Sequence, residues 1–264
     1  MIIIGEKING SIPSTKDAIE RKDADFIRNL AVKQTDAGAH YLDICAGTRP
    51  DVELETLRWL VEIVQDAVPT PLCIDSPDPD IIASIYPIVS KPGIINSVSG
   101  EGNKCDILYE LAAKSEWKII ALTCDDTGIP AAADKKVEIG SRLIEKAGEY
   151  GIAHERLLID PLVLSLAAVN DSLLNFLEAI RQLKAIYPGV GFTSGLSNIS
   201  FGMPKRKYVN RNFLVLALAA GMDSAIMDPT NDDMFATILA AEVLLGRDKY
   251  CRSYNTAFRK GRLV

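Results

Sequence analysis

Residues 157–161 read Leu-Leu-Ile-Asp-Pro, an apolar run that ends in a carboxylate and is followed at once by a proline. The same pattern of an apolar run with a polar end recurs at Asp75, Asn96 and Asn198. Such runs are typical of strands that are covered on both faces. If the strands are parallel and close into a barrel, their C-terminal ends meet at one mouth, the face that carries the active site in such barrels.

Strand patterns alternate with helical patterns along the whole chain. The expected strands are residues 2–4, 40–44, 72–74, 94–95, 118–122, 157–159, 190–193 and 224–227. A helix is expected after each strand, the seventh at 211–220 after a basic loop at 205–207, and the last running to about residue 245. Eight alternating units predict an α/β fold, a single-domain (β/α)8 TIM barrel over residues 1–264. The alternative is an open doubly wound sheet, which usually has a glycine-rich phosphate loop after its first strand; this chain has none.

The composition argues against a nucleic-acid-binding, membrane-spanning or disulfide-rich protein. The net charge of −6 and the pI of about 5.1 favour no nucleic acid partner, because nucleic acid binders usually present a basic face. The N-terminus lacks a basic region and its apolar run is short, so we expect a strand there, no signal peptide or membrane span, and a cytoplasmic protein. Five cysteines are scattered without a C-x-x-C pair, which favours reduced thiols over a disulfide framework or a zinc site.

Polar residues at the expected strand ends form the candidate site. They are Asp43, Asp75, Asn96, Asp160, Asn198 and Asp228. Carboxylates and amides suit a neutral, nitrogen-rich ring, because a carboxylate accepts two hydrogens from an amino group and the adjacent ring nitrogen. Each residue has a structural alternative, since Asp and Asn at strand ends often cap the next loop or helix. Asp43 and Asp228 look most like caps.

Two other chemistries remain open from the residues alone. Asp43, Asp75 and Asp160 are candidates for a two-metal carboxylate site, although such sites usually recruit histidine or closely spaced acids. Two carboxylates at the mouth are also formally compatible with glycoside hydrolysis. The absence of glutamate from the strand ends and the presence of only two tryptophans argue against sugars.

A set of motifs, in order along nearly the whole chain, resembles the methyltetrahydrofolate:corrinoid protein methyltransferases. These belong to the pterin-binding barrels, as do dihydropteroate synthase and the folate module of cobalamin-dependent methionine synthase. The matching stretches are residues 3–10 (IIGEKING), 73–76 (CIDS), 95–97 (INS), 122–123 (LT), 127–130 (TGIP), 159–162 (IDPL), 195–198 (GLSN), 210–211 (NR) and 250–251 (YC).

The resemblance implies roles for particular residues. Asp75, Asn96 and Asp160 are expected to hold the pterin ring, and Asn198 to lie beside the methyl-bearing ring nitrogen. Other implied contacts with the pterin or the mouth are Gly195, Ser197, Asn9, Asp43, Ser76 and Arg206. The chain departs from the family at Phe201, where well-known members have Gln, in the following Gly202-Met203-Pro204, and in residues 43–48.

The implied activity is methyl transfer between tetrahydrofolate and the cobalt of a corrinoid. The corrinoid (cobalamin) is expected on a partner protein, because the Asp-x-His-x-x-Gly motif of corrinoid carriers is absent and His40 and His154 lie in other contexts. No metal is expected on this chain itself. With no acid of near-neutral pKa evident, Asn198 is predicted to stabilise the charge and proton at the ring nitrogen, together with a water and Asp160.

The residues define the direction of methyl transfer, the binding partner and the oligomeric state less closely than they define the reaction. Transfer from methyltetrahydrofolate to cobalt and the reverse, as in demethylation pathways, are both compatible with one barrel. Family members are commonly homodimers, which the resemblance extends to this chain. Lys205, Arg206, Lys207 and Arg211 are candidates to meet an acidic partner or the glutamate tail of folate. The alternatives are an enzyme like dihydropteroate synthase, whose late Lys-x-x-Arg pattern is not clear here, and a folate-binding module without turnover.

Overall fold

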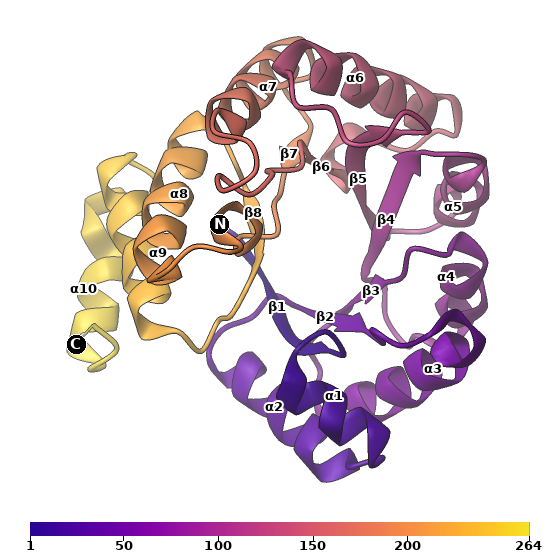
Figure 1. Ribbon diagram of the computed structural model, residues 1–264. Coiled ribbons are helices and arrows are strands. Elements are labelled where there is room, and N and C mark those ends of the chain that lie inside the picture. Colours follow the sequence, from indigo (N-terminus) through magenta and orange to yellow (C-terminus); the bar gives the residue numbers. More distant parts are fainter. Residues whose placement is uncertain (264) are drawn as a thin grey trace.

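Eight parallel strands form the centre of the molecule in the computed structural model, which describes residues 1–263 (Figure 1). They are β1 (Ile2–Asn9), β2 (Tyr41–Cys45), β3 (Leu72–Asp75), β4 (Ile94–Gly100), β5 (Lys118–Asp125), β6 (Leu157–Asp160), β7 (Gly191–Phe192) and β8 (Ser224–Met227). Their hydrogen-bonded order is β7-β6-β5-β4-β3-β2-β1-β8. Consecutive strands are therefore neighbours, with β8 returning to pair with β1.

The segment that follows β7 closes the ring against β8. The backbone N–H of Ile226 donates to the carbonyl of Ser194, and that of Leu196 donates to the carbonyl of Ile226, both at 3.0 Å. Gly195 also forms a parallel bridge with Ile226. The predicted (β/α)8 barrel is confirmed, and its closure brings the ends of β7 and β8 beside β1.

Ten α-helices surround the barrel in the described part of the chain (Figure 1). They are α1 (Pro13–Glu20), α2 (Ala24–Asp36), α3 (Pro50–Ala67), α4 (Pro79–Ile85), α5 (Lys104–Ala113), α6 (Ala133–Glu149), α7 (Ser172–Ile186), α8 (Arg206–Ala220), α9 (Asp232–Leu244) and α10 (Arg252–Arg259). Helices α2 to α9 each follow one strand. None of the helices within residues 1–263 combines the length and the apolar character needed to cross a membrane.

Helices α1 and α10 were not expected from the sequence. Helix α1 buries only Thr15, Ala18 and Ile19, and α10 buries only Ala257. Each helix has only eight residues, which is shorter than the window of about 11 to 18 residues over which apolar periodicity indicates a helix. Both helices therefore depend on packing against their neighbours, α1 against β1 and α2 and α10 against α9, which local sequence does not reveal.

Several boundaries also differ from the predictions. Strands β1, β4 and β5 continue beyond their apolar runs, because parallel pairing with neighbours holds their polar ends; Ile8 pairs with Ile44, for example. Helix α8 begins at Arg206, so the predicted loop at 205–207 contributes two residues to the first turn of the helix.

The barrel interior is built in layers that follow the two-residue period of a strand. One buried apolar cluster consists of Ile4, Cys73, Ile94, Ile120 and Leu158, separate from the large core between the barrel and its helices. Two positions further along the same strands are Glu6, Asp75, Asn96, Leu122 and Asp160. Period-two geometry turns these five toward the interior as well. An apolar floor thus lies beneath a mostly polar layer at the mouth.

Candidate active site

Three of the expected pterin-binding residues belong to this upper layer and come from β3, β4 and β6. Asp75 and Asn96 are paired in register on adjacent strands. Asp160 is the last residue of β6 and is only 6% exposed. The apolar floor below them excludes water, so an uncompensated polar atom of a ligand would be costly there and a hydrogen-bonded one is favoured.

Asp75 is a carboxyl group in a partly desolvated setting. Burial raises its pKa to about 6, the nearby Glu53 carboxylate adds to the rise, and a hydrogen bond with the Cys45 side chain opposes it. The group is ionised at neutral pH yet gains a proton readily under mild acid. An ionised carboxylate only accepts hydrogen bonds, which suits the N–H groups of a nitrogen-rich ring.

Asp43 lies one layer deeper than Asp75. It pairs in register with Cys73, is 2% exposed, and accepts a hydrogen bond of 3.1 Å from the amide nitrogen of Asn96. Burial, and then the charge of Asp75, hold the pKa of Asp43 well above its usual range. The interpretation of Asp43 as a cap was wrong: its partner lies across the interior, because an inward position on β2 points away from the following loop.

Asp160 is held by the turn that follows β6. The backbone N–H of Leu162 donates to its Oδ1 at 2.7 Å. Burial raises the pKa of Asp160 to about 6, while backbone N–H groups of Leu162 and Gly195 and the charge of Lys136 oppose that rise. Asp160 is therefore a local turn-former, as the capping interpretation predicts, and also an inward-facing carboxylate.

The loop between β7 and α8 carries the remaining expected residues. Asn198 begins the 3-10 turn η3 (Asn198–Ser200) and is exposed. Its amide lies close over Gly195, where a Cβ would come within 2.9 Å of Asn198 Nδ2. The Arg206 guanidinium donates to the carbonyl of Ser197 at 2.6 Å and to Ser200 Oγ at 3.0 Å. Arg206 thus fixes this loop from the start of α8.

Three other sequence candidates have partners within the fold. Asn9 accepts from the backbone of Ser11 at 2.8 Å and so forms the turn after β1. Ser76 donates to Glu53 at 2.6 Å. Asp228 accepts from the N–H and hydroxyl groups of Thr230 and pairs with Lys7 Nζ at 3.3 Å. The capping interpretation of Asp228 is confirmed, and the N-cap of α9 itself is Asn231.

Glu6 is the residue in the upper layer that the sequence reading did not single out. It lines a cavity of about 160 Å³ together with Ser197 and Asp228, beside the loop that carries Asn198. Burial, and then the charge of Asp228, raise the pKa of Glu6 to about 7, against the opposing charges of Lys7 and Arg206. The mouth therefore does contain an acid of near-neutral pKa. Its signal was the alternation Ile2, Ile4, Glu6 along β1.

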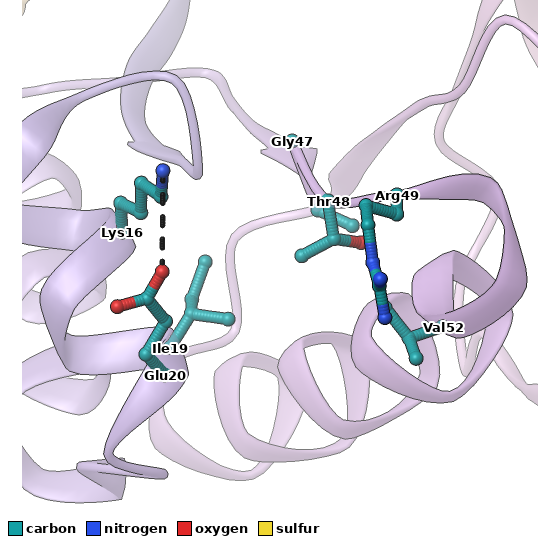
Figure 2. A pocket seen from close by; sticks show the side chains of 8 residues that line it. Lys16, Ile19, Glu20, Gly47, Thr48, Arg49 and Val52 are labelled. Atoms are coloured by element: carbon teal, nitrogen blue, oxygen red, sulfur yellow. Dashed lines mark ion pairs between the residues drawn. The ribbon is translucent and has the colours of Figure 1, made fainter.

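A larger cavity of about 520 Å³ lies between α1 and the loop that leads from β2 into α3 (Figure 2). Lys16 and Glu20 face it from α1, and Thr48 and Arg49 from the opposite side. The loops after β1 and β2 meet at Gly10 and Gly47. A Cβ on either glycine would overlap the backbone of the other loop, so both positions require glycine.

The described residues offer no ready metal cage. Within residues 1–263, no group of three or more His, Cys, Asp or Glu side chains is arranged to hold a metal ion. Both histidines of the chain precede strands, His40 before β2 and His154 before β6. They lie at the face opposite the mouth, and His40 Nδ1 accepts a hydrogen bond from the N–H of Ile3.

Known proteins resemble this chain over most of its length. A family model described as "Pterin binding enzyme" matches residues 5–228. The chain is 53% identical over 265 residues to the methylcorrinoid:tetrahydrofolate methyltransferase of Eubacterium limosum, with coverage of 100% of this chain and 98% of that protein. It is 31% identical over 240 residues to the methionine synthase of Mycobacterium tuberculosis, which covers 86% of this chain and 20% of that protein.

Solved structures show the same barrel. The dihydropteroate synthase of Xanthomonas albilineans with 4-aminobenzoic acid has a TM-score of 0.67 at 18% sequence identity, covering 94% of this chain and 92% of that one. At this identity the likeness shows the fold alone.

Proposed function

The chain belongs to the pterin-binding enzyme family, and on that basis we propose that it transfers a methyl group between tetrahydrofolate and the cobalt of a corrinoid carried by a partner protein. The end-to-end similarity to the Eubacterium limosum methyltransferase is the observation that carries this proposal. That enzyme's name gives methylcorrinoid first and tetrahydrofolate second. We therefore propose transfer from methylcorrinoid to tetrahydrofolate as the working direction.

The upper layer of the barrel supports a pterin in the mouth. Asp75 and Asp160 present carboxylates that accept N–H groups of the ring, and each such charge-assisted bond is worth about 1.5 to 3 kcal/mol. The amide nitrogen of Asn96 is engaged by Asp43, which leaves its oxygen to accept from the ligand. Gly195 and Ser197 form the wall beside Asn198.

Methyl transfer then needs the ring nitrogen N5 to face the opening. The N5 lone pair forms a bond to the methyl carbon, the electron pair of the broken bond stays on the cobalt, and the N5 proton leaves. Asn198 accepts or donates a hydrogen bond at N5 as charge develops, with a water and Asp160 completing the network. Holding the two reactants in line contributes as much or more to the rate.

The corrinoid is a substrate here, and the chain's own residues fit one that another protein presents. Both histidines lie at the face opposite the mouth, so neither can ligate the cobalt of a corrinoid above Asn198. Lys205, Lys207 and Arg211 follow the exposed loop after β7 and suit an acidic partner or the glutamate tail of folate.

We further propose that residues 1–264 act as one pterin-binding domain and that the protein is a cytoplasmic homodimer. Large apolar side chains exposed near the C-terminus support self-association; Leu244 is 80% exposed and Phe258 67%. Sedimentation velocity of the purified chain tests this, and a monomer across micromolar concentrations would contradict it.

The first experiment is an absorbance assay with methylcobalamin and tetrahydrofolate, followed by cob(I)alamin and methyltetrahydrofolate. Enzyme-dependent conversion of either pair supports the proposed function, and the faster pair gives the preferred direction. Tetrahydrofolate binding without turnover, both with free cobalamins and with a methylated corrinoid protein, would instead support a folate-binding module.

A further inference from the structure

Lys136 is a charged residue in the interior that the proposed reaction does not use. It lies on α6, one helical turn before Ile139 and Gly140 on the buried face of that helix, and it is 1% exposed. A buried ammonium group is destabilising unless hydrogen bonds and an opposite charge compensate it. Its retention in a well-packed helix face therefore requires a partner.

Its partners are two consecutive carbonyl groups in the turn after β6. Lys136 Nζ donates to the carbonyl of Pro161 at 2.7 Å and to that of Leu162 at 2.9 Å. The same turn supplies the Leu162 N–H that donates to Asp160 Oδ1 at 2.7 Å. Leu162 has a φ of +55°, a left-handed conformation that costs a non-glycine residue free energy. External contacts are needed to hold such a turn.

Two titratable groups face the Lys136 ammonium, Asp160 from β6 and Cys124 from β5. Burial lowers the pKa of Lys136 to about 8, and the charges of Asp160 and Cys124 oppose that shift. At neutral pH the ammonium therefore remains mostly protonated. Its charge in turn opposes the rise in the pKa of Asp160.

We propose that Lys136 is a positioning residue for the pterin: by binding the carbonyls of Pro161 and Leu162 it fixes the turn that orients the Asp160 carboxylate. The inference rests on the proposed function, because it assumes that Asp160 contacts the pterin. Lys136 acts through Asp160 and the turn, and does not itself reach the reacting atoms. A purely space-filling role is met equally well by an uncharged side chain of the same length.

The test compares Lys136→Met, which keeps the length and loses the charge and the donors, with the wild-type chain. Tetrahydrofolate binding is measured by anaerobic calorimetry from pH 5 to pH 9. We expect Lys136→Met to raise the Kd at pH 7 about tenfold, the loss of roughly one charge-assisted hydrogen bond. We also expect binding to weaken on acidification at a pH about one unit higher than in the wild type, because Asp160 loses a stabilising cation.

Lys135→Met is the matched control. Lys135 is the neighbour of Lys136 in the sequence but lies on the surface, where it pairs with Glu138 at 2.7 Å. Its removal should leave the Kd and its pH dependence unchanged. If Lys136→Met does not fold, as judged by circular dichroism, Lys136→Gln takes its place, because it keeps N–H donors while losing the charge, and the same shift of the acid limb is expected.

Two outcomes overturn the inference. A folded Lys136→Met with wild-type Kd and wild-type pH dependence shows that Lys136 only fills space or stabilises the helix. Equal weakening in Lys135→Met and Lys136→Met shows a nonspecific effect of charge. Wild-type protein that does not bind tetrahydrofolate is a separate result, because it speaks against the proposed function itself.

Discussion

The side-chain amide of Asn96 donates a hydrogen bond of 3.1 Å to the carboxyl group of Asp43, which lies one layer deeper in the barrel. This contact fixes the rotation of the Asn96 amide. Its nitrogen faces the interior partner, and its oxygen is left to accept an N–H group at the mouth. Asp43 thereby determines that Asn96 offers an acceptor oxygen at the mouth, although Asp43 itself lies in the middle of β2.

Replacing Asp43 tests whether it orients the Asn96 amide. Asp43→Asn keeps the shape of the side chain and an oxygen that accepts from the Asn96 amide, so we expect the Kd for tetrahydrofolate to change by less than about threefold. Asp43→Leu leaves the Asn96 amide unpaired and should weaken binding at least about tenfold. Calorimetry on both variants decides; equal Kd values in the two would exclude an orienting role.

Removing the Asp160 charge should weaken pterin binding directly. Asp160→Asn retains the size of the side chain but replaces a charged acceptor, so we expect the Kd to rise about 10- to 100-fold. Asp171→Asn is the control, since Asp171 is an exposed acid ahead of α7 on the same connection. Tetrahydrofolate titrations of both variants measure the effect, and a wild-type Kd for Asp160→Asn would remove Asp160 from the pterin site.

Binding of tetrahydrofolate should depend on pH through Asp75 and Asp160. Both carboxyl groups have a pKa raised to about 6, and only their ionised forms accept two N–H groups. The Kd should therefore be nearly constant between about pH 7 and pH 8 and rise as the pH falls through 6, about tenfold per unit for each group that must ionise. A flat Kd from pH 5 to pH 8 would contradict the assignment of both carboxylates to the ligand.

Glu6 should lower the stability of the unliganded protein at alkaline pH. Its pKa is raised from 4.5 to about 7 by burial first, so the folded state binds more protons than the unfolded state between those values. The free energy of unfolding then falls as the pH rises through this window. We expect Glu6→Gln to be more stable than wild type at pH 8, by up to about 3 kcal/mol, and to lose that advantage at pH 4.

Urea unfolding at both pH values measures this difference. Glu20→Gln is the control, because Glu20 is an exposed glutamate of α1 with a side chain 64% accessible. A stability gain of equal size in Glu20→Gln would attribute the effect to net charge and not to the mouth.

Asn198 is expected to act on the rate more than on binding. Asn198→Ala removes a hydrogen bond that strengthens as charge develops on N5, and losing one such group typically costs about 100- to 1,000-fold in kcat. Asn212→Ala, an exposed residue of α8 that donates to the carbonyl of Tyr208, is the control. Full turnover by Asn198→Ala in the methylcobalamin assay would sink the assignment.

The architecture of the barrel was accessible from the sequence because its strands are apolar runs with polar ends. The positions of Asp75, Asn96 and Asp160 at the mouth follow from that pattern and from the geometry of parallel strands. Asp43 was misread because its role depends on the face of β2 toward which it points, and a single acid near a strand end does not reveal which layer it occupies.

Glu6 and Lys136 were missed for different reasons. Glu6 continues the alternation of Ile2 and Ile4, but an alternation over only three positions is a weak signal. Lys136 shares the buried spacing of Ile139, Gly140 and Leu143 on α6, but a lysine in such a stripe normally extends to the surface. Only the turn after β6, distant in the sequence, shows why it stays inside.

The backbone contact between Gly10 and Gly47 makes one side of the rim resistant to change. Any side chain at either position would force the loops after β1 and β2 apart. Substitutions are therefore tolerated less well in this part of the rim. New partners or larger substrates are more easily accommodated at residues 201–204 of the loop after β7, where Phe201 is 70% exposed. A library of variants aimed at altered specificity is best placed there, with Gly10 and Gly47 left unchanged.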